Sequence, residues 1–125
     1  MAVILCAVAD EEKIFFINFW HWRAIVEVVR RLGIIPEDRV QALHDQYCGN
    51  GLTKEEAAKV ATAIRAQLLS TLSDKERVLL DGSRTTDPDD GAMHYEDPAK
   101  NYGTNAAVLQ KFVEFCELCD GFEVN

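Results

Sequence analysis

The sequence predicts an α+β fold in which three to four helices pack against a small antiparallel sheet. Strand-like segments lie near the two ends of the chain, and segments with helical periodicity fill the middle, an arrangement typical of that class. The chain of 125 residues has the usual length of one domain, so we expect a single globular domain over residues 1–125. Its hydrophobic content of 48 % and charged content of 27 % are ordinary for a folded protein.

The first two strands are predicted as a hairpin. Ala2–Val8 and Lys13–Ile17 are apolar, rich in β-branched and aromatic residues, and separated by a short break. In the second strand the alternation is imperfect, because Ile14 and Phe16 on one face are as apolar as the residues between them. This pattern indicates that helices or a partner cover both faces of that strand.

The strongest helix signal follows directly, from Asn18 to Gly33. Asn18 is a good N-cap residue, and Gly33 can end a helix in the left-handed conformation. The apolar residues recur at the spacing of one helix face, and they are Trp22, Ile25, Val26, Val29 and Leu32.

Further helices are predicted over residues 36–48, from a capping box at Thr53–Glu56 to Leu72, and over residues 104–119. Between the first two, Gly49-Asn50-Gly51 lacks the Lys of a P-loop and is interpreted as a turn. A second capping box begins at Ser73, so residues 74–80 are predicted as a short helix or, alternatively, a strand. Residues 81–103 show neither the helical nor the strand period and are expected to form a long loop. Residues 122–124 are expected to form a terminal strand beside the hairpin.

Composition argues against several classes of partner. The net charge of −8 disfavours nucleic acid, which is bound through clustered Lys and Arg. No apolar run is long enough to cross a membrane, and the apolar start, Ala2–Ala9, lacks the basic region of a signal peptide. We therefore expect a cytoplasmic protein whose four cysteines are thiols.

One pattern of residues could bind a metal. His44-x3-Cys48 and Cys116-x2-Cys119 each bring two ligands to one side of a helix, and together they could form a tetrahedral zinc site. The alternative is that all four side chains pack in or near the core. Zinc is the one cofactor that the sequence suggests, and no residue has the context of a catalytic nucleophile or base.

A second pattern concerns ligand or interface residues. On a helix Trp20 and Trp22 point about 200° apart, so one of them is expected at a cleft or interface, with His21 and Arg23 beside it. The alternative is that the hairpin and the 81–103 loop cover both. His94 and Tyr95 within that loop could face a pocket.

An uncovered indole would favour a homodimer. In such a dimer Arg23, Arg30 or Arg31 of one copy would meet Glu27 or Glu37 of the other.

Two motifs carry a resemblance. The segment NFWHWR at Asn18–Arg23 and the segment FVEFCELCDGFEV at Phe112–Val124 resemble a set of small, uncharacterised bacterial proteins, including some encoded on integron gene cassettes. No activity is assigned to that set, so the resemblance implies a shared fold and a bacterial source and supplies no catalytic residue.

Taken with the lack of a catalytic motif, these observations favour a non-catalytic module that binds a ligand or a protein. Two alternatives remain at this stage. One is a zinc-binding protein that uses the His and Cys pairs, and the other is a small enzyme with its site in the 81–103 loop.

Overall fold

The computed structural model describes residues 2–10, 12–45, 49–87, 96 and 103–124. These residues form an α+β fold with four α-helices, one π-helical turn and two antiparallel sheets. In chain order the elements are β1 (Ala2–Ala7), β2 (Ile14–Asn18), α1 (Phe19–Leu32), α2 (Glu37–His44), β3 (Gly51–Thr53), α3 (Lys54–Ile64), η1 (Arg65–Leu69), β4 (Arg77–Leu79), β5 (Arg84–Thr85), β6 (Gly103–Asn105), α4 (Ala106–Leu118) and β7 (Gly121–Val124).

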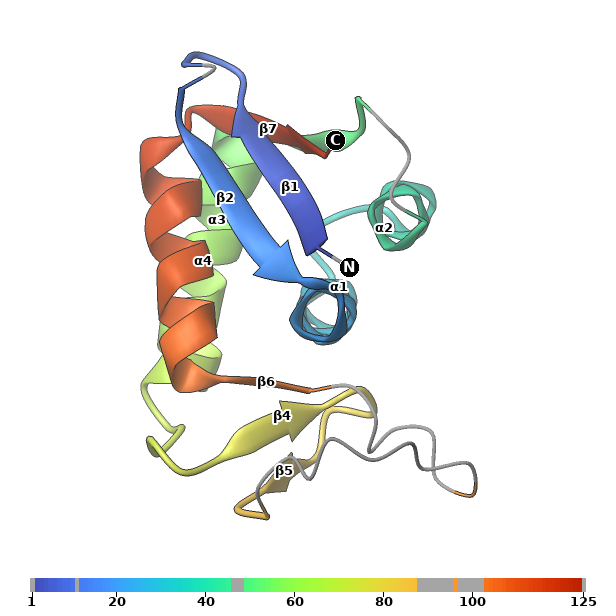
Figure 1. Ribbon diagram of the computed structural model, residues 1–125, viewed down its shortest axis with the longest axis vertical. Coiled ribbons are helices and arrows are strands. Elements are labelled where there is room, and N and C mark those ends of the chain that lie inside the picture. Colours follow the sequence, from blue (N-terminus) through green and yellow to red (C-terminus); the bar gives the residue numbers. More distant parts are fainter. Residues whose placement is uncertain (1, 11, 46–48, 88–95, 97–102, 125) are drawn as a thin grey trace.

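The larger sheet has the strand order β2–β1–β7–β3, and all of its neighbouring strands are antiparallel. The predicted hairpin is confirmed, since β1 and β2 pair from Ala2–Asn18 to Cys6–Ile14. The predicted C-terminal strand is confirmed as β7, which pairs with β1. Figure 1 shows β1 and β2 in front of α3 and α4, so the helices cover the back of these strands.

The core lies between this sheet and the helices. Residues of β1 alternate, so that Val3, Leu5 and Ala7 are buried against the helices. Three large aromatic side chains, Trp22, Phe112 and Phe122, meet edge to face at the centre, a geometry that aromatic rings favour. The apolar stripe predicted for the first long helix therefore becomes one wall of the core.

Local sequence rules account for the helix ends. The Asn18 side chain accepts a hydrogen bond of 2.8 Å from the Trp20 N–H, and Gly33 ends α1 with a φ of 71°. The predicted capping box at Thr53–Glu56 is present at the start of α3, with both reciprocal hydrogen bonds formed. The predicted cap at Asn18, the predicted helix end at Gly33 and the predicted capping box are all confirmed.

The interpretation of Gly49-Asn50-Gly51 as only a turn is wrong at its last residue. Gly51 begins β3, which forms the far edge of the larger sheet beside β7. A Cβ atom on Gly51 would lie 1.7 Å from the carbonyl oxygen of Phe122, so only glycine permits this close approach of the two strands. The glycine therefore serves strand packing as well as the turn.

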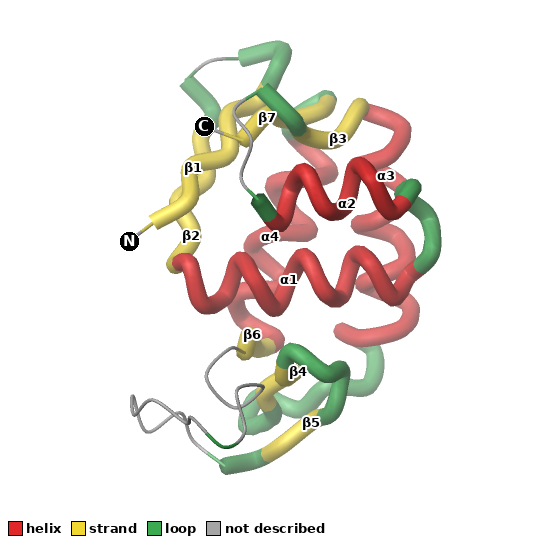
Figure 2. The backbone as a smooth tube through the Cα atoms, turned by 90° about the vertical axis from the view of Figure 1, so that its right-hand side faces the viewer, coloured by secondary structure: helices red, strands yellow, loops and turns green. Residues whose placement is uncertain are grey.

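The smaller sheet, ordered β5–β4–β6, differs most from the expectation. Residues 77–79 form a strand, which settles the open choice for 74–80, and the segment expected to be a loop contains β5 and the first residue of β6. Residues 88–95 and 97–102 of that segment lie outside the described part. Figure 2 shows this sheet against the side of α1 opposite to α2.

Two further features concern the helices. Helix α3 continues into the π-helical turn η1, where Arg65 donates hydrogen bonds of 2.6 and 3.0 Å to the two carboxylate oxygens of Glu117 on α4. This bidentate pair ties the ends of α3 and α4 together. Among the described residues, no helix is long and apolar enough to cross a membrane.

Candidate functional site

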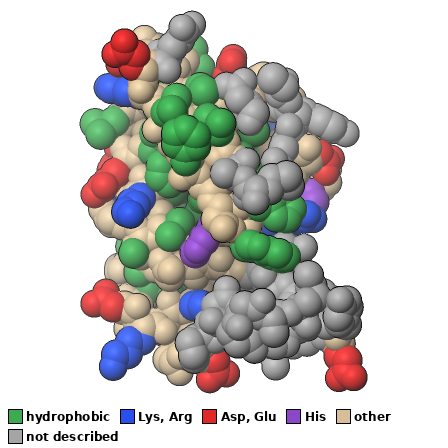
Figure 3. All heavy atoms as spheres, viewed as in Figure 1, with side chains coloured by type: hydrophobic (Ala, Val, Ile, Leu, Met, Phe, Trp, Pro, Cys, Tyr) green, Lys and Arg blue, Asp and Glu red, His purple; other side chains and the backbone are tan. Residues whose placement is uncertain are grey.

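The solvent side of the β1–β2 hairpin carries an apolar surface. We define the hairpin face as the outward side chains Ile4, Cys6, Val8, Ile14 and Phe16. Phe16 is 62 % exposed, Val8 60 % and Ile14 44 %, while Ile4 and Cys6 are half-buried. In Figure 3 hydrophobic side chains gather over the upper part of the molecule, where β1 and β2 lie in the same view.

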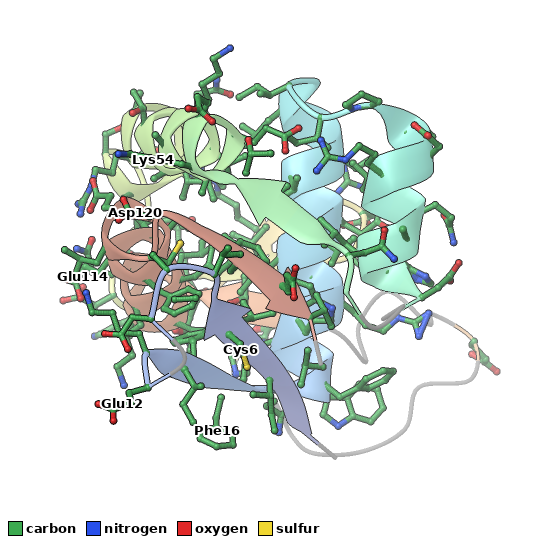
Figure 4. The ribbon with its side chains drawn as sticks, turned by 90° about the horizontal axis from the view of Figure 1, so that it is seen from above. Cys6, Glu12, Phe16, Lys54, Glu114 and Asp120 are labelled. Atoms are coloured by element: carbon green, nitrogen blue, oxygen red, sulfur yellow. The ribbon has the colours of Figure 1, made fainter. Side chains whose placement is uncertain are left out.

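The hairpin register explains how the face is assembled. Ile4 lies opposite Phe16, and Cys6 lies opposite Ile14. Neighbours across an antiparallel pair are close enough for their side chains to touch. Figure 4 shows Phe16 and Cys6 on the side of the strands away from the helices.

The large hydrophobic side chains that are exposed in the described part of the chain all lie on or near this hairpin. Besides Val8, Ile14 and Phe16 they are Trp20, which follows β2 at the start of α1, and Leu118 at the end of α4. Phe115, one helical turn before Leu118, stacks on Phe15 of β2 with ring centroids 5.6 Å apart. Leu118 therefore lies one helical turn from the contact between Phe115 and β2.

Acidic residues border the hairpin face. Glu12 precedes β2 in the connecting turn, and Glu123 of β7 lies beside Cys6 in the register; both are exposed. Lys13 is exposed and belongs to the opposite face by alternation. The outward side therefore combines an apolar centre with an acidic border.

The predicted interface residues Trp20, His21 and Arg23 do not form one site. Trp22 is the buried indole, at 1 % exposure, and its Nε1 donates to the Leu43 carbonyl at 3.2 Å, whereas Trp20 is 36 % exposed. This agrees with the expectation that the two indoles point in different directions.

The neighbours of Trp20 turn to opposite flanks of α1. The His21 Nδ1 lies 3.1 Å from the Thr104 hydroxyl in β6. The Arg23 guanidinium stacks over the Phe19 ring at 5.2 Å and contacts the His44 ring on α2 at 2.8 Å. In Figure 2 these two partners, β6 and α2, lie on either side of α1. His94 and Tyr95, the other predicted ligand residues, lie outside the described residues.

His44 has its own hydrogen-bond partners. Because arginine only donates, its contact makes His44 Nε2 the acceptor, and Nδ1 then donates to the Asp45 carboxylate at 3.0 Å. Hydrogen bonds from His44 and Gln41 hold the pKa of Asp45 below its ordinary value. Both ring nitrogens of His44 are therefore engaged within the chain.

The cysteines of the predicted zinc site belong to the core. Cys116 and Cys119 are 3 % and 1 % exposed, and burial raises the pKa of both thiols, most strongly that of Cys116. Cys48 lies outside the described residues. Over the ranges that are described, His44, Cys116 and Cys119 are not brought together, and no three His, Cys, Asp or Glu side chains are grouped as a metal site requires.

Arg30 is one of the residues predicted to form ion pairs across a homodimer, but it forms its ion pairs within one chain. Its guanidinium pairs with Glu27 and, at 3.0 Å, with Glu37. These two carboxylates are already used inside one copy, so they would contribute little to register in a dimer. The homodimer itself stays a prediction.

Two shallow pockets are also present among the described residues. One, of about 430 Å³, lies between β3, β7 and the start of α3 and reaches Val8 and Glu123 at the border of the hairpin face. In this pocket Lys54 pairs with Asp120 at 3.6 Å, and Arg39 pairs with Glu56. The other, of about 420 Å³, follows small residues on the outer side of α3. Neither pocket contains an unpaired acid and base set for proton transfer.

Comparison with known proteins gives no further constraint, since no family model, no curated protein and no solved structure matches this chain.

Proposed function

We propose that this chain is a non-catalytic protein-binding module and that the hairpin face is its binding surface. The observation that carries the proposal is the concentration of exposed large hydrophobic side chains on and around one hairpin. Contiguous apolar surface with a polar border is characteristic of sites that another protein covers.

The chemistry of the surface supports binding over catalysis. Its side chains are aliphatic or aromatic apart from the thiol of Cys6, and the bordering groups are carboxylates. The described titratable groups with shifted pKa values serve ion pairs, helix ends, one turn and the core: Asp45, Glu56, Arg65, Asp81, Cys116, Glu117 and Cys119. An active site would instead place such groups together in a cleft.

The proposed compartment is the cytoplasm. Cys116 and Cys119 lie one helical turn apart in the core and remain thiols, which suits a reducing environment. The acidic composition, with a net charge of −8, favours a protein partner over nucleic acid.

Site-specific photo-cross-linking in the source cells tests the proposal. The variant Phe16→p-benzoylphenylalanine should cross-link one or a few proteins, because residue 16 is the most exposed position of the hairpin face. The matched variant Thr62→p-benzoylphenylalanine, on the exposed side of α3, should cross-link none of them. Cross-links that are the same at both positions, or absent at Phe16, would contradict the proposal.

A second measurement uses the captured partner directly. The double variant Ile14→Asp, Phe16→Asp should weaken its binding at least about tenfold, since truncating a central aromatic anchor commonly costs 2 kcal/mol or more. Circular dichroism controls for folding, which we expect to be retained because both side chains are exposed. Unchanged affinity in a folded double variant would show that the surface lies elsewhere.

A further inference from the structure

Strand β2 is an open edge of the larger sheet. In the order β2–β1–β7–β3 it has a neighbour only on the β1 side. It is also the longer of the two edge strands, with five residues against three in β3. No described strand pairs with its outer side.

The hydrogen bonds of β1 show which groups of β2 face outward. The Ala7 N–H donates to the Lys13 carbonyl at 2.9 Å, and the next N–H, that of Val8, donates to Gly121 of β7 at 3.0 Å. Because these bonds alternate along a strand, Phe15 and Ile17 direct their main-chain groups to β1. The N–H and C=O groups of Ile14 and Phe16 therefore face the open edge.

Apart from the exposed Lys13 that directly precedes it, this edge lacks the features that usually protect one. Residues Ile14 to Asn18 contain no proline and no charged side chain, and their pairing with β1 runs without a bulge. Natural proteins commonly blunt exposed edges with such devices. The same residues that leave the edge open also place Ile14 and Phe16 on the hairpin face.

Charge decides what kind of strand fits. Glu12 lies at one end of the edge, whereas Glu123 lies on β7, two strands away from it. Figure 4 shows Glu114 of α4 and Glu12 on one side of the molecule and Phe16 at the adjoining lower border. A second copy of this chain would bring another net charge of −8, which opposes self-association. A strand that carries Lys or Arg would meet complementary charge instead.

We propose that the partner adds one extended segment to the outer edge of β2, with apolar residues that alternate along it and with Lys or Arg toward its ends. This inference rests on the proposed function and specifies its mode. Main-chain groups of Ile14 and Phe16 pair with the added strand, and alternate side chains of that strand contact Ile14 and Phe16 on one side and Leu118 on the other. Backbone pairing of this kind supplies affinity, and the side chains supply selectivity.

A displayed library of short random peptides is the probe. Enriched peptides should show apolar residues at every second position together with Lys or Arg. Acidic enrichment, apolar residues at helical spacing, or the absence of any enriched peptide would overturn the inference.

A matched pair of variants isolates the edge. Ile14→Pro removes the outward N–H of residue 14, whereas Ile14→Val keeps it and retains a branched apolar side chain of similar size. Peptide binding should fall at least about tenfold in Ile14→Pro relative to Ile14→Val, through one lost hydrogen bond and the steric block to pairing. Equal binding by the two variants would overturn the inference.

Hydrogen exchange on the wild-type chain gives the same test without a substitution. The amides of Ile14 and Phe16 should become protected when a selected peptide binds. Unchanged exchange at both amides would contradict strand addition even if Ile14→Pro fails to fold.

Charge is tested with Glu12→Gln, which should weaken binding of a selected peptide and reduce its dependence on salt. Glu55→Gln, at an exposed position of α3, is the control and should do neither. Equal effects of the two substitutions would contradict the basic character of the strand.

The outcomes separate this inference from the proposed function. Peptide binding that is lost in Phe16→Asp but unaffected by Ile14→Pro would leave the hairpin face as the site and exclude strand addition. Binding unaffected by Phe16→Asp would remove the proposed function as well. A dimer in sedimentation that Ile14→Pro dissociates would assign the edge to a second copy and overturn the basic partner.

Discussion

The two faces of the β1–β2 hairpin have the same kind of residues and different surroundings. On the inner face Val3, Leu5 and Ile17 are at most 4 % exposed, whereas on the outer face Ile14 is 44 % and Phe16 62 % exposed. Burial against the helices accounts for the hydrophobicity of the inner face. Packing among the described residues does not explain why the outer face is hydrophobic. This hydrophobicity therefore supports the proposal that the face binds another molecule.

Helix α1 shows the same contrast between a buried side chain, Trp22, and a partly exposed one, Trp20. This pair gives the largest expected effect on the free energy of unfolding. Trp22→Ala should lower the free energy of unfolding by about 3–5 kcal/mol, because the cavity opens at the centre of the aromatic core. Trp20→Ala should cost less than half as much, since this indole is partly exposed. Urea denaturation of both variants measures the difference, and equal losses would contradict the assignment of Trp22 as the core indole.

Within the hairpin, Leu5→Ala should lower the free energy of unfolding by about 2–5 kcal/mol. Phe16→Ala removes a larger side chain, yet it should cost less than about 1 kcal/mol because most of that ring is already in water. Chemical denaturation on the two single variants is the measurement. A larger loss for Phe16→Ala would mean that another part of the chain covers the outer face.

Charged groups away from the hairpin give a smaller, pH-dependent effect. Hydrogen bonds from Arg65 hold the pKa of Glu117 below its ordinary value of 4.5. A carboxyl whose pKa is lower in the folded state stabilises the fold above its unfolded pKa, and this stabilisation is lost as pH falls through the folded pKa.

Accordingly, the free energy of unfolding should decrease on acidification below about pH 4.5, and Glu117→Gln should make that decrease shallower. Thermal melts of both proteins across an acid pH series provide the comparison. Identical pH profiles would show that the Arg65–Glu117 pair makes no net contribution, as exposed pairs sometimes do.

Thiol labelling compares the faces without altering stability. In a Cys48→Ser background, Cys6 on the hairpin face should react with a thiol reagent well before Cys116, whose burial both blocks access and raises its pKa. Mass spectrometry of peptides after timed labelling identifies the modified residue. Reaction at Cys116 as fast as at Cys6 would indicate that α4 opens readily.

Local chemistry made much of the fold predictable. The cap at Asn18, the left-handed end at Gly33 and the capping box at Thr53 each act within a few residues, so a single sequence contains the whole signal. The hairpin is also local, since its strands are separated by a short turn. These elements formed as expected.

The elements that could not be predicted depend on distant partners. β3 has three residues and pairs with β7 near the other end of the chain, so neither length nor period indicates a strand. β4, which the sequence left open between a helix and a strand, has three residues and pairs with the nearby β5 and the distant β6. β5 has two residues and β6 three, and a buried polar residue, Thr104, gives β6 no apolar pattern. Tertiary pairing, which composition does not contain, decides these segments.

The candidate surface was partly visible in the sequence. The run from Ile14 to Ile17 lacks the polar alternation of a half-buried strand, and this pattern predicted cover on both faces by helices or by a partner. In the described part of the chain, helices lie against one face of the hairpin. Sequence reasoning instead placed the interface at Trp20, His21 and Arg23, because tryptophan is a common anchor, and it did not identify β2 as an edge.

The hairpin is fixed in register at its two ends: Asn18 caps α1 at one, and the bond from Ala7 to Lys13 closes the turn at the other. Ile14 and Phe16, the outward residues between these two ends, take part neither in the Asn18 cap nor in the Ala7–Lys13 hydrogen bond. Substitutions at those two positions therefore leave these contacts and the core in place, so the proposed binding surface can diverge under natural selection while the core remains constant. A lineage could change its binding specificity by substitutions at these sites without first acquiring compensating changes in the fold.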